Sequence, residues 1–90
     1  MASSSLGEPA LDASLMTLDR IPPRGRCRVA RVTGGDGIAQ RLMELGLIEG
    51  SEVEVVRLAP LGDPMELTLF GYRLSLRKSE AARVEVEPCP

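Results

Sequence analysis

Residues 36–47 read Asp-Gly-Ile-Ala-Gln-Arg-Leu-Met-Glu-Leu-Gly-Leu and carry both the start and the stop signals of one short helix. Asp36 is a favourable N-cap, because its carboxylate accepts hydrogen bonds from the free backbone N–H groups of the first turn. Gly46 can adopt the left-handed conformation that ends a helix and lets Leu47 fold back in a Schellman motif. Three apolar side chains recur at the spacing of one helix face, and these are Ile38, Leu42 and Leu45.

On both sides of this helix the hydrophobic pattern has a period of two, which indicates β-strands. The predicted strands cover residues 24–32, 52–58, 65–69, 72–77 and 83–87. The alternation changes phase after Val29 and again at Val56, which indicates a bulge or a bend where the sheet curves. A proline-rich loop at 59–64, a tight hairpin at Phe70-Gly71 and one helical turn at 78–82 complete the pattern. These features favour a mainly β fold, a small and partly open barrel of about five strands with one short helix.

Composition and length exclude several classes of protein. The chain has 90 residues, enough for one small domain, and contains no histidine. Histidine is the commonest catalytic acid or base and a common metal ligand, so most hydrolases and zinc enzymes are excluded. Cys27 and Cys89 lie far apart, unlike the paired cysteines of metal or redox motifs, and we expect Cys27 to pack as a small hydrophobe. The sequence predicts no enzyme and no cofactor, and it identifies no metal ligands.

The ends of the chain differ from its middle. Residues 1–15 are rich in serine, alanine and glycine without any periodicity, which predicts a disordered leader before a domain at 16–90. No apolar run is long enough to span a bilayer, and no secretory signal is visible. We therefore expect a cytoplasmic protein.

Three features of the sequence are candidates for ligand binding. The glycine-rich residues 33–37 precede the helix but lack the Lys-Ser or Lys-Thr pair of a phosphate-binding loop, which favours a simple turn. Arg24, Arg26 and Arg28 share one strand face, which is compatible with a nucleic-acid-binding module. Glutamates alternate on the other predicted strands, so cross-strand ion pairs are the simpler explanation. In the loop, Asp63 is expected to stabilise a turn rather than bind a cation.

The end of the helix is the candidate partner-binding site. At least two of its leucines must pack in the core, but a small domain can leave part of such a stripe exposed. The predicted partner-binding residues are Leu42, Leu45, Gly46 and Leu47.

Several segments together resemble the FeoA family of bacterial ferrous iron uptake. They are Arg41–Leu47, Gly50, the Ala-Pro-Leu-Gly-Asp-Pro run at 59–64, and the Gly-Tyr-Arg-Leu-Ser-Leu-Arg run at 71–77. The resemblance implies an SH3-like barrel with an inserted helix. It also implies an accessory protein that docks on the cytoplasmic GTP-binding part of the FeoB permease and modulates iron(II) transport. Transition-metal association is implied for the family, although this chain has no histidine and no paired cysteines. A similar barrel in iron-dependent repressors makes a regulatory module the alternative.

Overall fold

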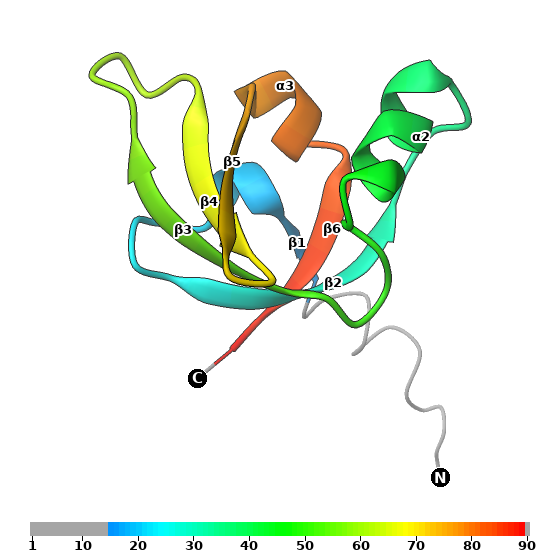
Figure 1. The fold of residues 1–90 in the computed structure, drawn as a ribbon, viewed down its shortest axis with the longest axis horizontal. Coiled ribbons are helices and arrows are strands. Elements are labelled where there is room, and N and C mark those ends of the chain that lie inside the picture. The colour runs from blue at the N-terminus through cyan, green and yellow to red at the C-terminus, as the bar shows by residue number, and fades with distance from the viewer. Residues whose placement is uncertain (1–14, 90) are drawn as a thin grey trace, which may run out of the picture.

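Six antiparallel strands form one curved sheet in the computed structural model, which describes residues 15–89 (Figure 1). Their order across the sheet is β1-β6-β2-β3-β4-β5. The strands are β1 (Met16–Thr17), β2 (Arg26–Val32), β3 (Glu52–Leu58), β4 (Met65–Leu69), β5 (Tyr72–Leu76) and β6 (Val84–Pro88). The helices are the 3-10 turn η1 (Leu18–Arg20), α2 (Gly37–Glu44) and α3 (Lys78–Ala81). The predicted leader at 1–15 lies outside the described residues, except for Leu15.

The predicted mainly β, partly open fold is confirmed. Strands β1 and β5 are the two outer strands, and within residues 15–89 they do not pair with each other. The count of about five strands missed β1, whose two residues pair only with β6 and are too few to show an alternating pattern. Pairing shifts by one residue between Val29 and Arg31 and between Val55 and Arg57. These are bulges at the two positions where the alternation changes phase, and they bend the sheet.

The inward face of the sheet forms the core. Alternate residues of each long strand are buried there, as in the pattern Met65, Leu67 and Leu69 of β4. Cys27 lies in this core with no exposed surface, and both cysteines are free thiols. Burial raises the pKa of the Cys27 thiol to about 12, with a smaller contribution from Cys89. Cys27 is therefore packed as a hydrophobe, as its strand position predicts.

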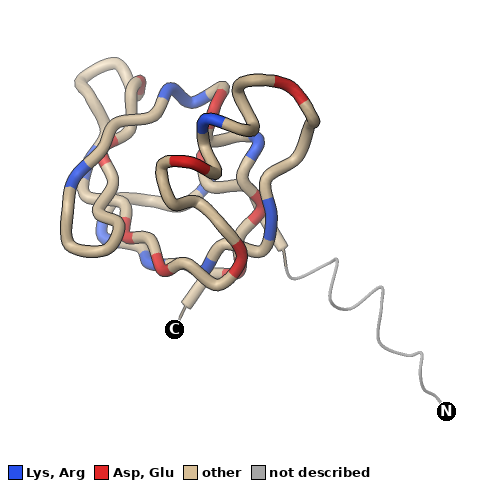
Figure 2. Tube along the Cα trace, turned by 45° about the vertical axis from the view of Figure 1, so that its right-hand side comes forward, with Lys and Arg blue, Asp and Glu red and all other residues tan. Residues whose placement is uncertain are grey.

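The outward face carries ion pairs between neighbouring strands. Arg28 of β2 contacts Glu52 of β3 at 3.1 Å, and Arg31 contacts Glu85 of β6 at 2.6 Å. Figure 2 shows cationic and anionic positions interleaved along the trace rather than gathered on one face. The predicted cross-strand pairing is confirmed. The predicted start of the first strand at Arg24 is wrong, because Arg24 has a φ of 72° and lies in the turn before β2.

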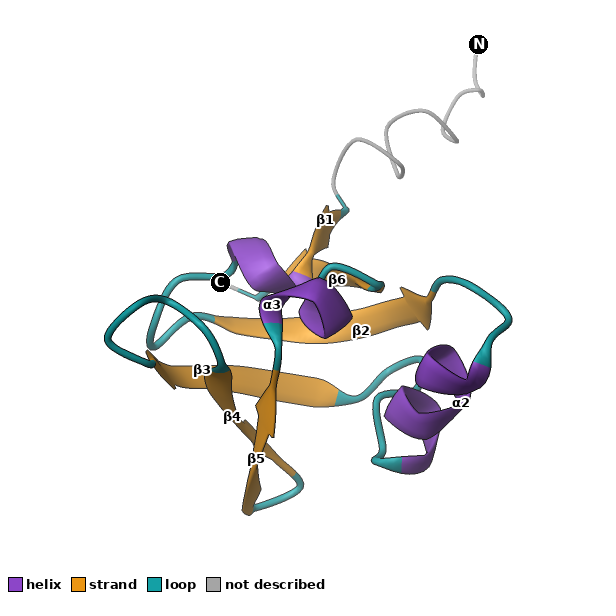
Figure 3. Ribbon diagram, turned by 90° about the horizontal axis from the view of Figure 1, so that it is seen from above, coloured by secondary structure: helices purple, strands orange, loops and turns teal. Residues whose placement is uncertain are grey.

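Helix α2 begins and ends as its sequence predicts. The Asp36 carboxylate accepts a hydrogen bond from the Ala39 N–H at 3.2 Å. At the other end Gly46 has a φ of +110°, and the Leu47 N–H donates to the Leu42 carbonyl at 3.2 Å, which completes a Schellman motif. The expected position of Ile38 on the buried face is wrong. Ile38 is 41% exposed, because the buried face of α2 runs through Ala39 and Leu42 and Ile38 lies at its edge. Helix α2 itself lies to one side, near the end of β2 (Figure 3).

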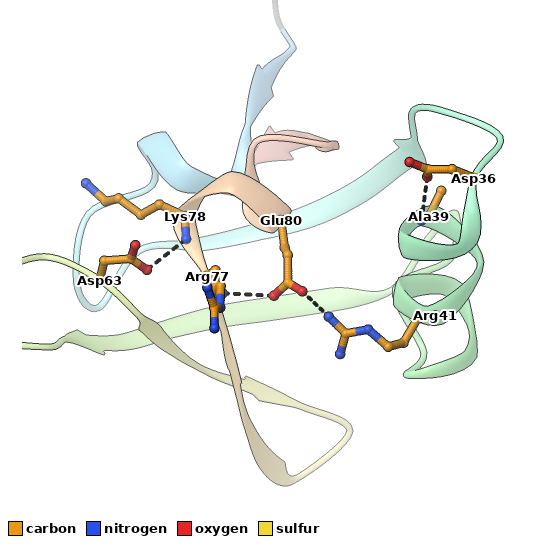
Figure 4. Close-up of polar contacts among 7 residues, drawn as sticks. All are labelled: Asp36, Ala39, Arg41, Asp63, Arg77, Lys78 and Glu80. Carbon is orange, nitrogen blue, oxygen red and sulfur yellow. Dashed lines mark hydrogen bonds and ion pairs between the residues drawn. The ribbon is translucent and has the colours of Figure 1, made fainter.

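Two polar contacts fasten α2 to the C-terminal part of the chain. The Arg83 guanidinium lies 2.5 Å from the Asp36 carboxylate and, with the Ala39 N–H, lowers the pKa of that carboxyl to about 2. On the next turn Arg41 forms an ion pair with Glu80 of α3 (Figure 4). Residues 33–37 therefore form the predicted turn, held by a protein carboxylate and a protein guanidinium.

Helix α3 is the single predicted turn, and a loop side chain caps it. The Lys78 N–H donates to the Asp63 carboxylate at 3.0 Å (Figure 4). The Arg77 N–H donates to the Glu80 carboxylate, also at 3.0 Å. Asp63 therefore caps a helix fifteen residues along the chain, and the prediction that it stabilises its own turn is wrong.

Candidate protein-binding site

The structure separates the four predicted partner-binding residues into two groups. Leu42 and Leu47 have no exposed surface and belong to the core. Leu45 is partly buried against that core, and Gly46 lies next to it at the helix end. Leu42 and Leu47 are therefore the leucines expected to pack in the core, and their side chains present no surface to a partner. Partner binding at this end of α2 stays a prediction.

Three other large apolar side chains are exposed beside Gly46. Ile48 is 51% exposed, Phe70 67% and Tyr72 47%, and the last two are the only aromatic residues of the chain. A Cβ atom added to Gly46 would lie 3.2 Å from the Phe70 ring and 3.4 Å from the Tyr72 hydroxyl. The tip of the β4–β5 hairpin therefore packs directly on the end of α2. We call Ile48, Phe70 and Tyr72, grouped around Gly46, the helix-end surface.

Hydrogen bonds fix the backbone of this surface. The Gly46 carbonyl accepts the Ile48 N–H at 2.9 Å and the Ser51 hydroxyl at 2.8 Å. The Ser51 N–H donates to the Ile48 carbonyl at 3.0 Å, and Ser51 is itself buried. The turn that presents Ile48 is thus folded on itself. A shallow depression runs beside it, between Gly50 and the hairpin residues Phe70 and Gly71.

Acidic residues border the helix-end surface. Glu44 ends α2, Glu49 follows Ile48, and Glu52 lines the same depression as Phe70. Between residues 42 and 56 the chain contains four glutamates and no lysine or arginine. Glu52 is paired with Arg28, whereas within residues 15–89 neither Glu44 nor Glu49 forms an ion pair. The surface is apolar at its centre and acidic at its edge.

Sequence reasoning missed Phe70 and Tyr72 as site residues. The pattern assigns Phe70 to a hairpin turn and Tyr72 to the first position of a strand, and both assignments describe the backbone correctly. The sequence does contain a signal for this surface, because its only two aromatic residues flank Gly71 at a predicted turn. Aromatic side chains at exposed positions mark interfaces more often than other residue types do.

Nothing in the described residues suggests catalysis or a metal centre. No group of three or more His, Cys, Asp or Glu side chains in residues 15–89 is placed to hold a metal ion. No helix in this part of the chain is long and apolar enough to cross a membrane.

Comparison with known proteins agrees with this architecture. Residues 16–88 match the FeoA domain. The chain belongs to the FeoA family. Among curated proteins, this FeoA chain is 35% identical over 72 residues to the Fe(2+) transport protein A/Fe(2+) transporter FeoB fusion protein of Porphyromonas gingivalis. The match covers 80% of this chain and only 8% of that fusion protein.

Solved structures of FeoA proteins share the fold. The FeoA-like protein from Clostridium acetobutylicum superposes with a TM-score of 0.81 at 32% identity, over 86% of this chain and 90% of that one. FeoA from Stenotrophomonas maltophilia, solved in complex with zinc and described as an SH3 domain protein, gives 0.72 at 39% identity over 80% and 89%. The fold is therefore SH3-like. The FeoA family is associated with ferrous iron transport and is not a family of enzymes.

The zinc of the Stenotrophomonas protein belongs to that structure. The present FeoA chain has no histidine, and its described residues contain no cluster of potential ligands. Its carboxylates lie spread along strand faces, whereas a metal site needs several ligand atoms that converge on one point. The residues present do not fit a resident metal ion, and none is assigned.

Proposed function

We propose that this FeoA chain is a cytoplasmic accessory protein of ferrous iron uptake. It binds the cytoplasmic GTP-binding part of a FeoB-type permease and modulates iron(II) transport. The observation that carries the proposal is the Porphyromonas gingivalis relative, in which a stretch similar to this chain is fused to FeoB. Fusion keeps two domains at high effective concentration, and a separate chain with the same role must replace the covalent link with a binding surface.

The helix-end surface supports a binding role. It exposes large apolar side chains on a fixed backbone, and such a surface in a small domain is typical of protein contacts. The proposed docking region is the end of α2, where the sequence predicts the partner-binding residues Leu42, Leu45, Gly46 and Leu47. Leu45 and Gly46 contribute to its surface, while Leu42 and Leu47 hold it in place from the core.

A binding experiment tests the proposal. The full chain, labelled with ¹⁵N, is titrated with the GTP-binding domain of the permease from the same genome, and separately with the intact permease in nanodiscs. We expect chemical-shift changes or line broadening that centre on residues 42–50 with at least one of the two. Absence of binding to both, with and without GTP, would contradict the proposal.

Modulation of transport needs its own measurement. Deleting this chain from cells that retain the permease should change the rate of ⁵⁵Fe(II) uptake without changing the amount of permease in the membrane. An unchanged rate of uptake would leave binding without the proposed consequence.

The charges of the chain weaken the alternative of a nucleic-acid-binding or repressor-like module. Of the candidate residues Arg24, Arg26 and Arg28, Arg28 already pairs with Glu52, and the net charge of the chain is −2. A binder that neutralises several phosphates shows affinity that falls steeply with salt. Detectable RNA or DNA binding at about 50 mM salt would revive this reading.

A further inference from the structure

We infer that Phe70, Tyr72 and Ile48 dock into an apolar patch on the cytoplasmic part of the permease, and that lysine and arginine side chains border this patch and meet Glu44 and Glu49. This inference rests on the proposed function and specifies both the residues that bind and the chemistry of the surface they fit. Three independent features of the helix-end surface support it: the conformation of Phe70, the hydrogen bonds within the surface and the charge at its edge.

Phe70 is placed where folding alone does not favour a phenylalanine. Its φ is +53° and that of Gly71 is +84°, as at the two central positions of a type I′ turn. Asparagine followed by glycine is preferred at these positions, and a bulky residue with positive φ is uncommon. One edge of the ring packs on Gly46, but the side chain stays 67% exposed. A residue that breaks a local rule for a small packing gain is expected at a functional site.

Hydrogen bonds within the chain hold the surface in place. The Tyr72 hydroxyl donates to the Leu45 carbonyl at 2.7 Å, which joins the hairpin to the end of α2. The turn that carries Ile48 is closed by the hydrogen bonds of Ser51. Ordered side chains and turns lose less conformational entropy on binding, so a small surface of this kind can bind specifically.

The charge of the surface selects the partner. Glu44 and Glu49 are exposed and, in the described part of the chain, neither forms an ion pair. A second copy of this chain docked on the same face would bring these carboxylates against each other. A surface bordered by lysine and arginine gains attraction instead, which favours a basic partner over self-association.

The size of the surface fits a partner held nearby. An interface made by three large apolar side chains is small, and interfaces of small buried area are typical of weak, transient complexes. In the fused relative the covalent link supplies effective concentration, so a small contact is sufficient there. For a separate chain we expect fast exchange and a strong dependence of affinity on these few residues.

The decisive variant is Phe70→Asn. Asparagine suits the positive φ of the turn, so we expect the melting temperature to change by no more than about 5 °C. Affinity for the permease should nevertheless fall at least about tenfold, as expected when a central interface aromatic is removed. Leu61→Asn is the matched control, because Leu61 is 96% exposed on the 59–64 loop, and its affinity should equal that of the wild type.

A second pair of variants tests the acidic border. Glu44→Lys combined with Glu49→Lys should weaken binding more than about fivefold at 50 mM salt, with a smaller effect at 500 mM, since salt screens exposed charges. Glu87→Lys changes an exposed carboxylate on β6 and is the control of equal charge for each single variant, Glu44→Lys and Glu49→Lys. Equal weakening by the control would show a general charge effect and overturn the assignment of the border.

The outcomes separate this inference from the proposed function. If the wild type does not bind the permease at all, both are overturned. If the wild type binds and folded Phe70→Asn binds equally well, only the surface assignment is overturned. Should Phe70→Asn not fold, Ile48→Asn, at a position 51% exposed, carries the same test. A wild-type dimer in sedimentation that Phe70→Asn abolishes would overturn the choice of a basic partner over a second copy.

Discussion

The hydroxyl of Tyr72 donates a hydrogen bond of 2.7 Å to the carbonyl oxygen of Leu45, which joins the outer strand β5 to the C-terminal end of α2. Carbonyl groups in the last turn of a helix have no partner within the helix. The bond therefore satisfies a helix end and, at the same time, places the two exposed aromatic residues beside it. The helix-end surface depends on this contact between residues 27 positions apart.

Tyr72→Phe should test that contact directly. The variant keeps the ring and removes the hydroxyl, so we expect a loss of about 0.5–1.5 kcal/mol in the free energy of unfolding. Urea denaturation of the two proteins measures the difference. If the two midpoints coincide, water replaces the hydroxyl without loss and the hairpin is held by packing alone.

Gly46→Ala should lower the free energy of unfolding by more than about 1 kcal/mol, because the positive φ of this position is unfavourable for alanine. The new Cβ would also lie 3.1 Å from a Leu69 methyl group and 3.2 Å from the Phe70 ring. Gly37→Ala is the matched control within the same helix. A Cβ there meets no atom within 4 Å, and alanine favours the helix, so thermal unfolding should show equal or greater stability.

Asp36→Asn should reveal the ion pair with Arg83 through its pH dependence. Asparagine retains a capping oxygen but loses the charge, so the variant isolates the ion pair from the cap. The folded pKa of Asp36, about 2, lies below its ordinary value of 3.8. Its stabilising effect is thus fully present above about pH 4 and is lost as the pH falls toward 2.

Acid denaturation of both proteins checks this prediction. The difference in stability between wild type and Asp36→Asn should shrink over that interval. A difference that stays constant from pH 5 to about 2 would contradict the role of the charge.

The two cysteines should differ sharply in reactivity. Cys27 is buried and its pKa is raised to about 12, so its reactive thiolate is suppressed in the folded protein. Cys89 is partly exposed and should react first with a thiol reagent such as dithionitrobenzoate. Cys27 should react only at the rate at which the fold opens, and urea should accelerate it. Rapid labelling of two thiols in the native protein would contradict the burial of Cys27.

High pH should also destabilise the protein through Cys27. The folded pKa lies above the ordinary value of 9.0, so the unfolded chain releases this proton more easily. Stability linked to this group is therefore present below about pH 9 and falls as the pH rises above it. Cys27→Ala, which has no titrating group, is the reference for this measurement.

Much of the fold follows from local chemistry and could be read from the sequence. The Asp36 cap and the Gly46 stop bound α2 because both act on backbone groups only a few residues away. The Phe70-Gly71 turn joins two strands for the same reason. The two phase breaks in the alternation marked the bulges, since a bulge inserts one residue locally.

Only the tertiary structure decided which side chains of these elements are exposed. The alternation of apolar and polar residues distinguishes the two faces of a strand. Whether a side chain on the apolar face is buried depends on segments far away in the sequence that pack against it. In β5 the inward row runs from buried Leu76 through Leu74 to Tyr72, which is 47% exposed where the hairpin extends past the core. Ile38 is exposed at the start of α2, at the edge of the buried face that Ala39 and Leu42 form.

The amino-acid pattern predicted five of the six strands, the helix α2, the turn α3 and the resemblance to the FeoA family, and it missed only the short strand β1 and the 3-10 turn η1. The tertiary structure decided that Leu42 and Leu47 face the core and that Phe70 and Tyr72 reach the solvent beside Gly46. The physical reason is the range of the interactions involved. Caps, turns and periodicity act between neighbours along the chain, whereas burial and surface composition depend on contacts between residues far apart in it.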